Sequence, residues 1–323
     1  MMESTDPSPS NPEKSLRQAL TILEDKTHPC FASPDADIIL GAKDRTLFRV
    51  HSYTLKTTSG WFRSLFSLPQ RPCTSPSATS GFTSTSTSGF ASTSFSAEVI
   101  HLDEDAHTLE SLLCMICGLP VHAPTSYDSI DALLFAAEKY DMPGPISLLR
   151  ILVLTPPLLD QPLRLYAAAS RFGWDPEARQ ASAQTLTLNI HAPEHRATLR
   201  KLDTDAVLAL FELHRARREG LRRRLDEHPF VGSTIVALCP RCRRQIDHHT
   251  WRELKYKVIL EMDTRPLGDT VVGVGLLEWP EARACWEAKC PNGECACVLY
   301  DKTETLRLIR ECVDGLPKTT GDI

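Results

Sequence analysis

The sequence predicts an α+β fold in which a small β-sheet with a helical cluster precedes a mainly helical region and a small cysteine-rich C-terminal module. Short β-prone runs alternate with helical runs in the first half of the chain. After Pro156-Pro157 the pattern becomes almost wholly helical until about residue 229. Six of the eleven cysteines lie between Cys239 and Cys297, which indicates a local purpose for them.

The bulk composition is that of a globular protein of about two domains. The chain has 323 residues, of which 42% are hydrophobic and 24% charged. Its formal net charge is -5, so the chain as a whole lacks the excess of basic residues that favours binding to nucleic acid. No apolar run approaches the roughly 20 residues that cross a bilayer, and the N-terminus is unlike a signal peptide. We therefore expect a cytoplasmic or nuclear protein without a membrane partner.

The first expected elements are an arm and a short helix. Residues 1–13 carry Pro, Ser and Asn without hydrophobic periodicity, so we expect a disordered N-terminal arm. Residues 14–26 place Leu16, Leu20 and Leu23 at helical spacing. The apolar stripe of this helix needs a partner to cover it.

A hairpin, a helix and a third strand follow. Residues 36–40 and 46–50 are β-prone runs around a Gly-containing turn, which predicts a hairpin. Residues 52–68 have the apolar spacing of one helix. Residues 69–97 are rich in Pro, Ser and Thr, and their low complexity predicts a disordered insert. The pattern resumes with a short strand at residues 98–102.

Helices complete the first domain and make up the region after it. In the first domain, which we place at residues 14–154, they are expected at residues 106–117, 126–140 and 144–154. The helical region of residues 155–229 should contain helices at residues 159–172, 176–188, 193–199 and 204–225.

The first half of the chain resembles a BTB/POZ domain over about residues 28–150. The resemblance rests on several separate elements that occur in the right order. They are the strand Asp37-Ile38-Ile39-Leu40, the strand end Phe48-x-Val50-His51, the helical residues Leu55, Ser59, Phe62 and Phe66, the strand Glu98-Val99-Ile100-His101-Leu102, and the helical segment ending Ala136-Ala137-Glu138-Lys139-Tyr140. The whole arrangement, with a BACK-like helical region and a cysteine-bearing tail, resembles the expanded BTB proteins of filamentous and mushroom-forming (basidiomycete-type) fungi.

The resemblance implies a symmetric homodimer that acts as a platform for an unidentified protein partner. The dimer or partner contacts it implies involve Leu16, Leu20, Leu23, Asp37, His51, Leu55 and Phe62. We therefore expect a non-enzymatic protein–protein interaction adaptor. His51 lacks the nucleophile and orienting carboxylate that a catalytic base would need, which agrees with this expectation.

An alternative within the family is a substrate adaptor for a cullin-type ubiquitin ligase. Relatives that recruit a cullin commonly place a hydrophobic-x-acid signature between the second helix and the third strand. The nearest fragment here is Leu68-Pro69-Gln70, which has an amide in place of the acid. The missing carboxylate and the long insert both count against recruitment of a cullin.

The C-terminal module of residues 230–323 contains a candidate metal site. Cys239-Pro-Arg-Cys242 is a tight C-x-x-C turn, and Cys290 and Cys295 bracket a second turn. Structural zinc takes four soft ligands at tetrahedral geometry, and two such turns supply them. We predict a structural zinc ion held by these four cysteines.

Other ligand sets stay open. Cys285 and Cys297 are reserve ligands, although Cys285 falls in a predicted helix. His248 or His249 could replace one cysteine, although their place just before Trp251 also suits a helix start. The plain alternative to a metal site is a set of separate, reduced thiols.

A rival hypothesis is a transcription-associated DNA-binding protein that uses the cysteine module and the basic run Arg215–Arg224. Glu219 interrupts this run, which favours a solvated helix face and makes nucleic acid a disfavoured partner. Gly273-Val274-Gly275 is too short for a phosphate-binding loop and predicts a turn or bulge in a β-strand over residues 270–277.

Overall fold

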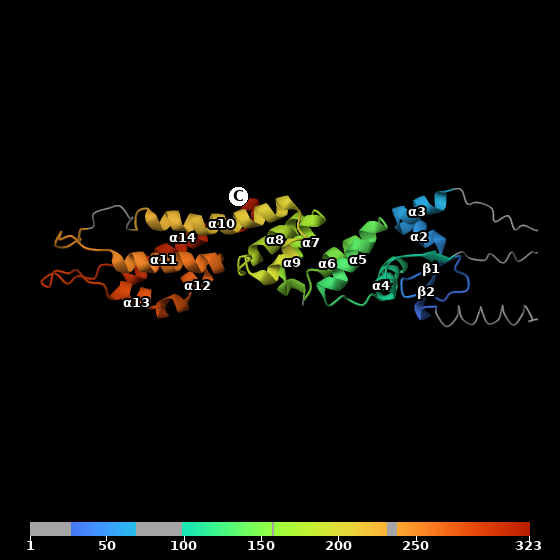
Figure 1. The fold of residues 1–323 in the computed structure, drawn as a ribbon, viewed down its shortest axis with the longest axis horizontal. Coiled ribbons are helices and arrows are strands. Elements are labelled where there is room, and N and C mark those ends of the chain that lie inside the picture. The colour runs from blue at the N-terminus through green and yellow to red at the C-terminus, as the bar shows by residue number, and fades with distance from the viewer. Residues whose placement is uncertain (1–26, 69–98, 157, 231–237) are drawn as a thin grey trace, which may run out of the picture. The chain divides into compact units, whose positions relative to one another are not determined.

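The computed structural model describes residues 27–68, 99–156, 158–230 and 238–323. The chain divides into two compact units, Met1–Leu158 and Leu159–Ile323 (Figure 1). The expected arm at 1–13, the helix with Leu16, Leu20 and Leu23, and the insert at 69–97 lie outside the described residues. The described part is mostly helical with one small sheet, as the α+β prediction requires.

The sheet of the first unit contains three strands in the order β2-β1-β3. β1 (Ile38–Gly41) pairs antiparallel with β2 (Leu47–Val50), with Ile38 opposite Val50, and this confirms the predicted hairpin. β3 (Val99–His101) pairs parallel with β1, so that the strand after the insert returns beside the first strand. Five residues of β1 and β2 are buried and the other three are partly buried, with Phe48 fully buried.

Helices make up most of the rest of the first unit. The expected boundaries agree with the structure within a few residues except at residues 52–68. The helical elements of the first unit are the short 3₁₀ helix η1 (Pro29–Phe31) and the helices α2 (Ser52–Thr58), α3 (Gly60–Ser67), α4 (Ala106–Cys117), α5 (Tyr127–Lys139) and α6 (Pro143–Leu152).

The single helix expected over residues 52–68 is wrong, because the chain breaks at Ser59. This residue has an extended backbone, with φ -130° and ψ 125°, and caps the start of α3. Its buried hydroxyl accepts a hydrogen bond from the backbone N–H of Phe62 at 3.1 Å and donates one to the carbonyl of Tyr140 at 2.5 Å. Local capping therefore outweighs the continuous apolar pattern.

The second unit is built almost entirely from helices. Its elements are η2 (Leu158–Asp160, at the boundary), α7 (Pro162–Arg171), α8 (Asp175–Thr185), η3 (Pro193–His195), α9 (Arg196–Leu199), α10 (Thr204–Asp226), α11 (His249–Thr264), α12 (Asp269–Val272), η4 (Val274–Glu278), α13 (Pro280–Glu287), α14 (Lys302–Asp314) and η5 (Thr320–Asp322).

The strand expected at residues 270–277 is wrong, since this stretch forms α12 and η4. Gly268, at φ 79°, turns the chain into α12, and the Arg265 guanidinium pairs with Asp269 at 2.8 Å. Val271 and Leu276 are then fully buried in the core. Tertiary packing overrides the local β-propensity of a valine-rich run.

One hydrophobic core extends across the boundary expected between residues 229 and 230. Leu221 and Leu225 of α10 pack in the same cluster as Trp251 of α11 and Ile309 of α14. In Figure 1, α10 runs alongside α11 and α14. Helices on both sides of this expected boundary therefore contribute to the same core.

A buried arginine adds polar contacts to this junction. Arg217 of α10 donates hydrogen bonds to the carbonyls of Pro266, Leu267 and Pro317, at 2.6, 2.9 and 2.6 Å. Removal of this side chain would leave three carbonyls without their donor. Among the described residues, no helix is both long and apolar enough to cross a membrane.

Candidate metal centre

Two tight turns of the second unit bring the predicted ligands together. In the first turn, Leu238 and Gln245 form an antiparallel bridge, and the Cys239 N–H donates to the Arg244 carbonyl at 2.8 Å. Arg243 has φ 59°, the left-handed conformation that reverses the chain after Cys242. The turn therefore directs two cysteines of a C-x-x-C pattern to one side.

The second turn has the same plan with two more residues. Lys289 and Val298 form the bridge, and the Cys290 N–H donates to the Cys297 carbonyl at 2.9 Å. Cys295 stands two residues before the closing residue Cys297, as Cys242 stands two residues before Arg244. Cys290 and Cys295 thus correspond in position to Cys239 and Cys242.

The four sulfurs surround a common point. The Sγ atoms of Cys239, Cys242, Cys290 and Cys295 all lie within 4.8 Å of one another. The distance is 3.5 Å between the sulfurs of Cys242 and Cys290 and 3.8 Å between those of Cys239 and Cys295. A tetrahedron with zinc–sulfur bonds of about 2.3 Å has sulfurs about 3.8 Å apart. The arrangement is compatible with a structural metal.

The surroundings of the thiols suit a cation. Cys239 and Cys290 are buried against Ile246, in a small apolar cluster of their own. Backbone N–H groups of Cys242 and Arg241 lower the pKa of Cys239 to about 6, although burial opposes this shift. The Asn292 N–H also lowers the pKa of Cys290, but desolvation and the neighbouring thiols raise it to about 12. Sulfurs this close cannot all ionise unless a cation compensates their charge.

The two reserve cysteines differ in position. Cys285 is fully buried in α13 within the main core, where burial raises the pKa of its thiol to about 12. It is therefore outside the thiol cluster. Cys297 is beside the cluster, with its sulfur 3.4 Å from that of Cys239 and 3.6 Å from that of Cys295.

The histidines considered as substitute ligands have other contacts. The Nδ1 of His248 lies 2.5 Å from the Tyr300 hydroxyl, and His248 occupies the N-cap position of α11 without a side-chain capping bond. His249 is the first residue of α11 and lies 3.1 Å from the Glu253 carboxylate. Both histidines thus lie at the start of a helix, which was the alternative to metal ligation in the sequence analysis.

In the first unit, some of the residues predicted to contact a second copy or a partner lie on the surface and others lie in the core. Asp37 accepts hydrogen bonds from the N–H and hydroxyl of Ser52, at 2.7 and 2.6 Å. Partial burial would raise the pKa of Asp37, but these bonds outweigh it and lower the pKa. His51 is exposed at the N-terminus of α2 without a side-chain capping bond. Leu55 and Phe62 lie in the core of their own chain, so any effect on a partner must be indirect.

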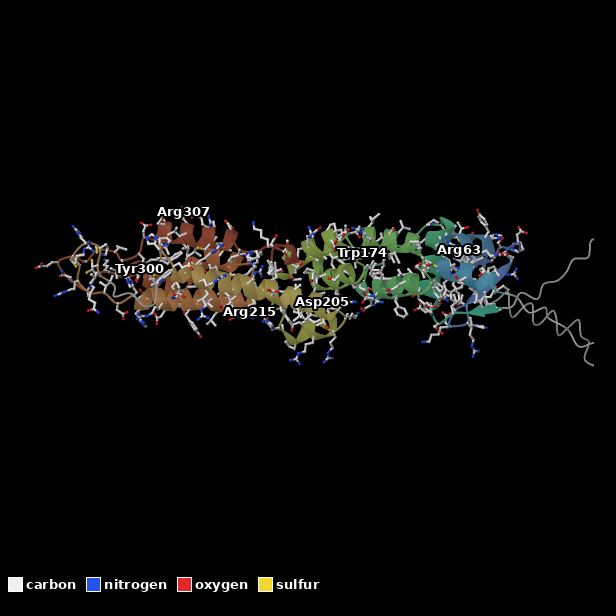
Figure 2. All side chains as sticks on the ribbon, turned by 90° about the horizontal axis from the view of Figure 1, so that it is seen from above. Arg63, Trp174, Asp205, Arg215, Tyr300 and Arg307 are labelled. Atoms are coloured by element: carbon white, nitrogen blue, oxygen red, sulfur yellow. The ribbon has the colours of Figure 1, made fainter. Side chains whose placement is uncertain are left out.

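Three arginines of the α10 run make contacts within the fold. Arg218 pairs with Asp263 at 2.7 Å, and Arg224 donates hydrogen bonds to the carbonyls of Cys312 and Gly315. Arg217 is buried as described above, whereas Arg215 is exposed (Figure 2). Arg222 and Arg223 are exposed as well, so the run combines three arginines with contacts inside the fold and three on the surface.

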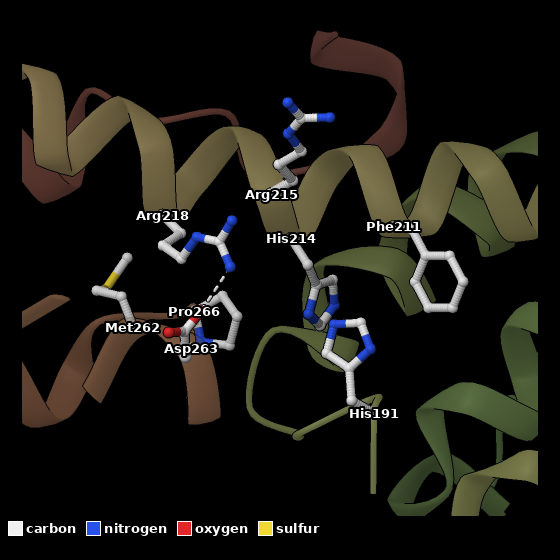
Figure 3. Close-up of a pocket in the computed structure, with 8 residues that line it drawn as sticks. All are labelled: His191, Phe211, His214, Arg215, Arg218, Met262, Asp263 and Pro266. Atoms are coloured by element: carbon white, nitrogen blue, oxygen red, sulfur yellow. Dashed lines mark hydrogen bonds and ion pairs between the residues drawn. The ribbon is translucent and has the colours of Figure 1, made fainter. Parts of the chain in front are cut away.

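The sequence did not predict a cavity of about 280 Å³ between α10, the C-terminal end of α11 and the loop around His191 (Figure 3). The His191 ring stacks on Phe211 with centroids 5.4 Å apart, and His214 lies beside it. The Nε2 of His214 is 3.2 Å from the Thr185 hydroxyl. The α10 residues of this lining share one helix face, but His191 and Asp263 join them only through the fold, so the sequence did not reveal the cavity.

Comparison of the sequence with protein-family models and with curated proteins finds no match. The BTB/POZ resemblance therefore remains a prediction from the residues quoted for it.

Proposed function

We propose that the protein is a non-enzymatic interaction adaptor that pairs with a second copy through its BTB/POZ-like first unit and carries a structural zinc ion in its second unit. The observation that carries the zinc part of this proposal is the thiol cluster of Cys239, Cys242, Cys290 and Cys295. Four protein ligands complete the coordination of zinc and leave no open position for a reacting water. The metal would therefore stabilise the end of the second unit that is offered to a partner.

Zinc has a clear structural task at this place. The cluster joins two turns that are far apart in sequence, and its own apolar contacts are few. Binding energy for a structural zinc ion is folding energy for such a segment. The adaptor would thus gain an ordered surface at the two turns without a large local core.

Pairing of two copies is supported by the first unit. The helices α2 and α3 expose Tyr53 at 77% and Trp61 at 37% of their surface. Large aromatic side chains of this kind are common in protein interfaces. The sheet order and the helices around it also suit the resemblance on which the dimer prediction rests.

Metal content measured on purified full-length protein tests the zinc part of the proposal. We expect one zinc ion per chain in the wild type and in Cys312→Ser, whose thiol in α14 is outside the cluster. Cys295→Ser should lose the ion, because it removes one of the four ligands. Wild-type protein well below one zinc per chain, or a Cys295→Ser variant with full zinc, would contradict the proposal.

The same sample can test the adaptor itself. Affinity purification from cells, with the solution mass measured on the recovered protein, should yield a dimer of the 36.0 kDa chain together with a protein partner. Recovery of a cullin would favour the ligase alternative. Salt-sensitive binding to a DNA duplex, measured by fluorescence anisotropy, would favour the rival DNA-binding function instead.

A further inference from the structure

The thiol cluster contains one sulfur more than a tetrahedral metal can bind. Cys297 is outside the group of four sulfurs that lie within 4.8 Å of one another. Its Sγ is nevertheless 3.4 Å from that of Cys239 and 3.6 Å from that of Cys295. Since structural zinc takes four ligands, a free thiol remains in contact with the ligand set.

The backbone of the second turn holds this fifth thiol in place. The carbonyl of Cys297 accepts the hydrogen bond from the Cys290 N–H that closes the turn. Between Cys295 and Cys297, Ala296 has φ 38° and its N–H donates to the Asn292 carbonyl at 2.9 Å. Both cysteines therefore reach the cluster, and Cys297 does so from a partly exposed position.

We propose that Cys297 is a redox partner of the zinc ligands, and that a peroxide joins it to Cys239 in a disulfide that releases the metal. This inference rests on the zinc centre of the proposed function. Reversible disulfides in intracellular proteins commonly act as redox sensors. The surface presented by the two turns would then depend on the redox state of the cell.

The chemistry needs hydrogen peroxide, the Cys297 thiol, the zinc-bound Cys239 thiolate and one proton from solvent. The Cys297 sulfur attacks one peroxide oxygen, the O–O bond breaks, and a sulfenic acid and one water form. The Cys239 thiolate then attacks the Cys297 sulfur, the S–S bond forms, the S–O bond breaks, and the hydroxide that leaves takes a proton from solvent to become a second water. The two sulfurs together lose two electrons, and one peroxide is reduced to two waters.

Two features select Cys239 as the second sulfur. The Cys239 sulfur lies 3.4 Å from the Cys297 sulfur, whereas the Cys295 sulfur lies 3.6 Å from it. In addition, a bond between Cys295 and Cys297 would close a small ring over one residue, which restricts the torsion near 90° that disulfides prefer. Loss of Cys239 leaves zinc with three ligands from two turns, so its affinity falls.

The experiment uses full-length protein that has been loaded with zinc and then freed of reductant. Hydrogen peroxide is added, zinc release is followed with a chromogenic chelator, and disulfides are mapped by mass spectrometry of peptides. We expect the wild type to release zinc and to form a Cys239–Cys297 disulfide, and a thiol reductant with added zinc to reverse both changes. Cys297→Ser should bind zinc normally and lose the peroxide-dependent release.

Cys30→Ser is the matched control, since it removes an exposed thiol of the first unit and should behave as the wild type. Equal release rates from Cys297→Ser and wild type, or a disulfide that omits Cys297, would overturn the inference. So would a Cys297→Ser variant that cannot bind zinc, because Cys297 would then be a ligand. Protein without zinc before oxidation would refute the zinc centre alone, and disulfide mapping would still decide whether Cys239 and Cys297 join.

Discussion

Among single residues, His214 has the clearest link between burial and stability. It lies on α10 beside the cavity of Figure 3, with only 6% of its surface exposed. Burial first, and then the nearby His191 and Arg217, lower the pKa of His214 to about 4. The ring is therefore neutral in the folded protein at pH values where an exposed histidine would begin to bind a proton.

This lowered pKa predicts acid sensitivity. Between the ordinary pKa of 6.5 and the folded value of about 4, the unfolded chain binds a proton that the folded chain does not. Stability should thus fall as the pH falls through this window, by up to about 3 kcal/mol in total. Urea unfolding at several pH values should show a shallower pH dependence for His214→Gln than for the wild type.

The exposed His122 provides the matched control for this prediction. His122→Gln should keep the wild-type pH dependence, since water solvates that ring in both states. If His214→Gln retained the full slope, other groups would be responsible for the acid sensitivity.

At the scale of elements, the sequence predicted most helices and strands but missed the break at Ser59 and the helices at residues 269–278. Helix α4 was predicted at its observed ends, because Asp105 caps it and Gly118, at φ 69°, ends it. The break at Ser59 depends on the carbonyl of Tyr140, which is distant in sequence. The helices at residues 269–278 depend on core contacts of Val271 and Leu276. Such contacts are set by tertiary packing, which local patterns do not contain.

The candidate site was predicted better than its surroundings. C-x-x-C and C-x4-C spacings identify turns that can hold a metal, so four sulfurs could be chosen from sequence. Cys285 could be set aside from the cluster because Pro280 indicated the start of α13. The contact between Cys239 and Cys297 could not be predicted, because it depends on how the two turns face each other.

The two bonds of the Ser59 hydroxyl should stabilise the junction of α2 and α3. We expect Ser59→Ala to lower the free energy of unfolding by about 1–3 kcal/mol, since it removes a cap and leaves the Tyr140 carbonyl without this donor. Chemical denaturation measures this loss. Ser64→Ala is the control, because its exposed hydroxyl bonds only to the Gly60 carbonyl four residues earlier. A Ser59→Ala variant as stable as Ser64→Ala would show that the junction depends on other contacts.

At the scale of the whole molecule, the central prediction is association of two chains. Light scattering of the purified protein should give a dimer, and Tyr53→Glu should shift it toward monomer by placing a charge at an apolar contact. Leu208→Glu is a matched control, since Leu208 is also exposed, at 58%, but belongs to α10 of the second unit. A monomeric wild type, or equal effects of the two substitutions, would contradict dimerisation through α2.

The spacing of the two cysteine turns also has a consequence for synthesis of the chain. Cys242 leaves the ribosome 48 residues before Cys290 does, counted from their positions in the sequence. Synthesis adds about 5–20 residues per second, so the second pair of thiols follows the first by roughly 2–10 seconds. During that interval the nascent chain carries only one of the two turns of the proposed metal centre, so the centre can form only after the second turn has been made.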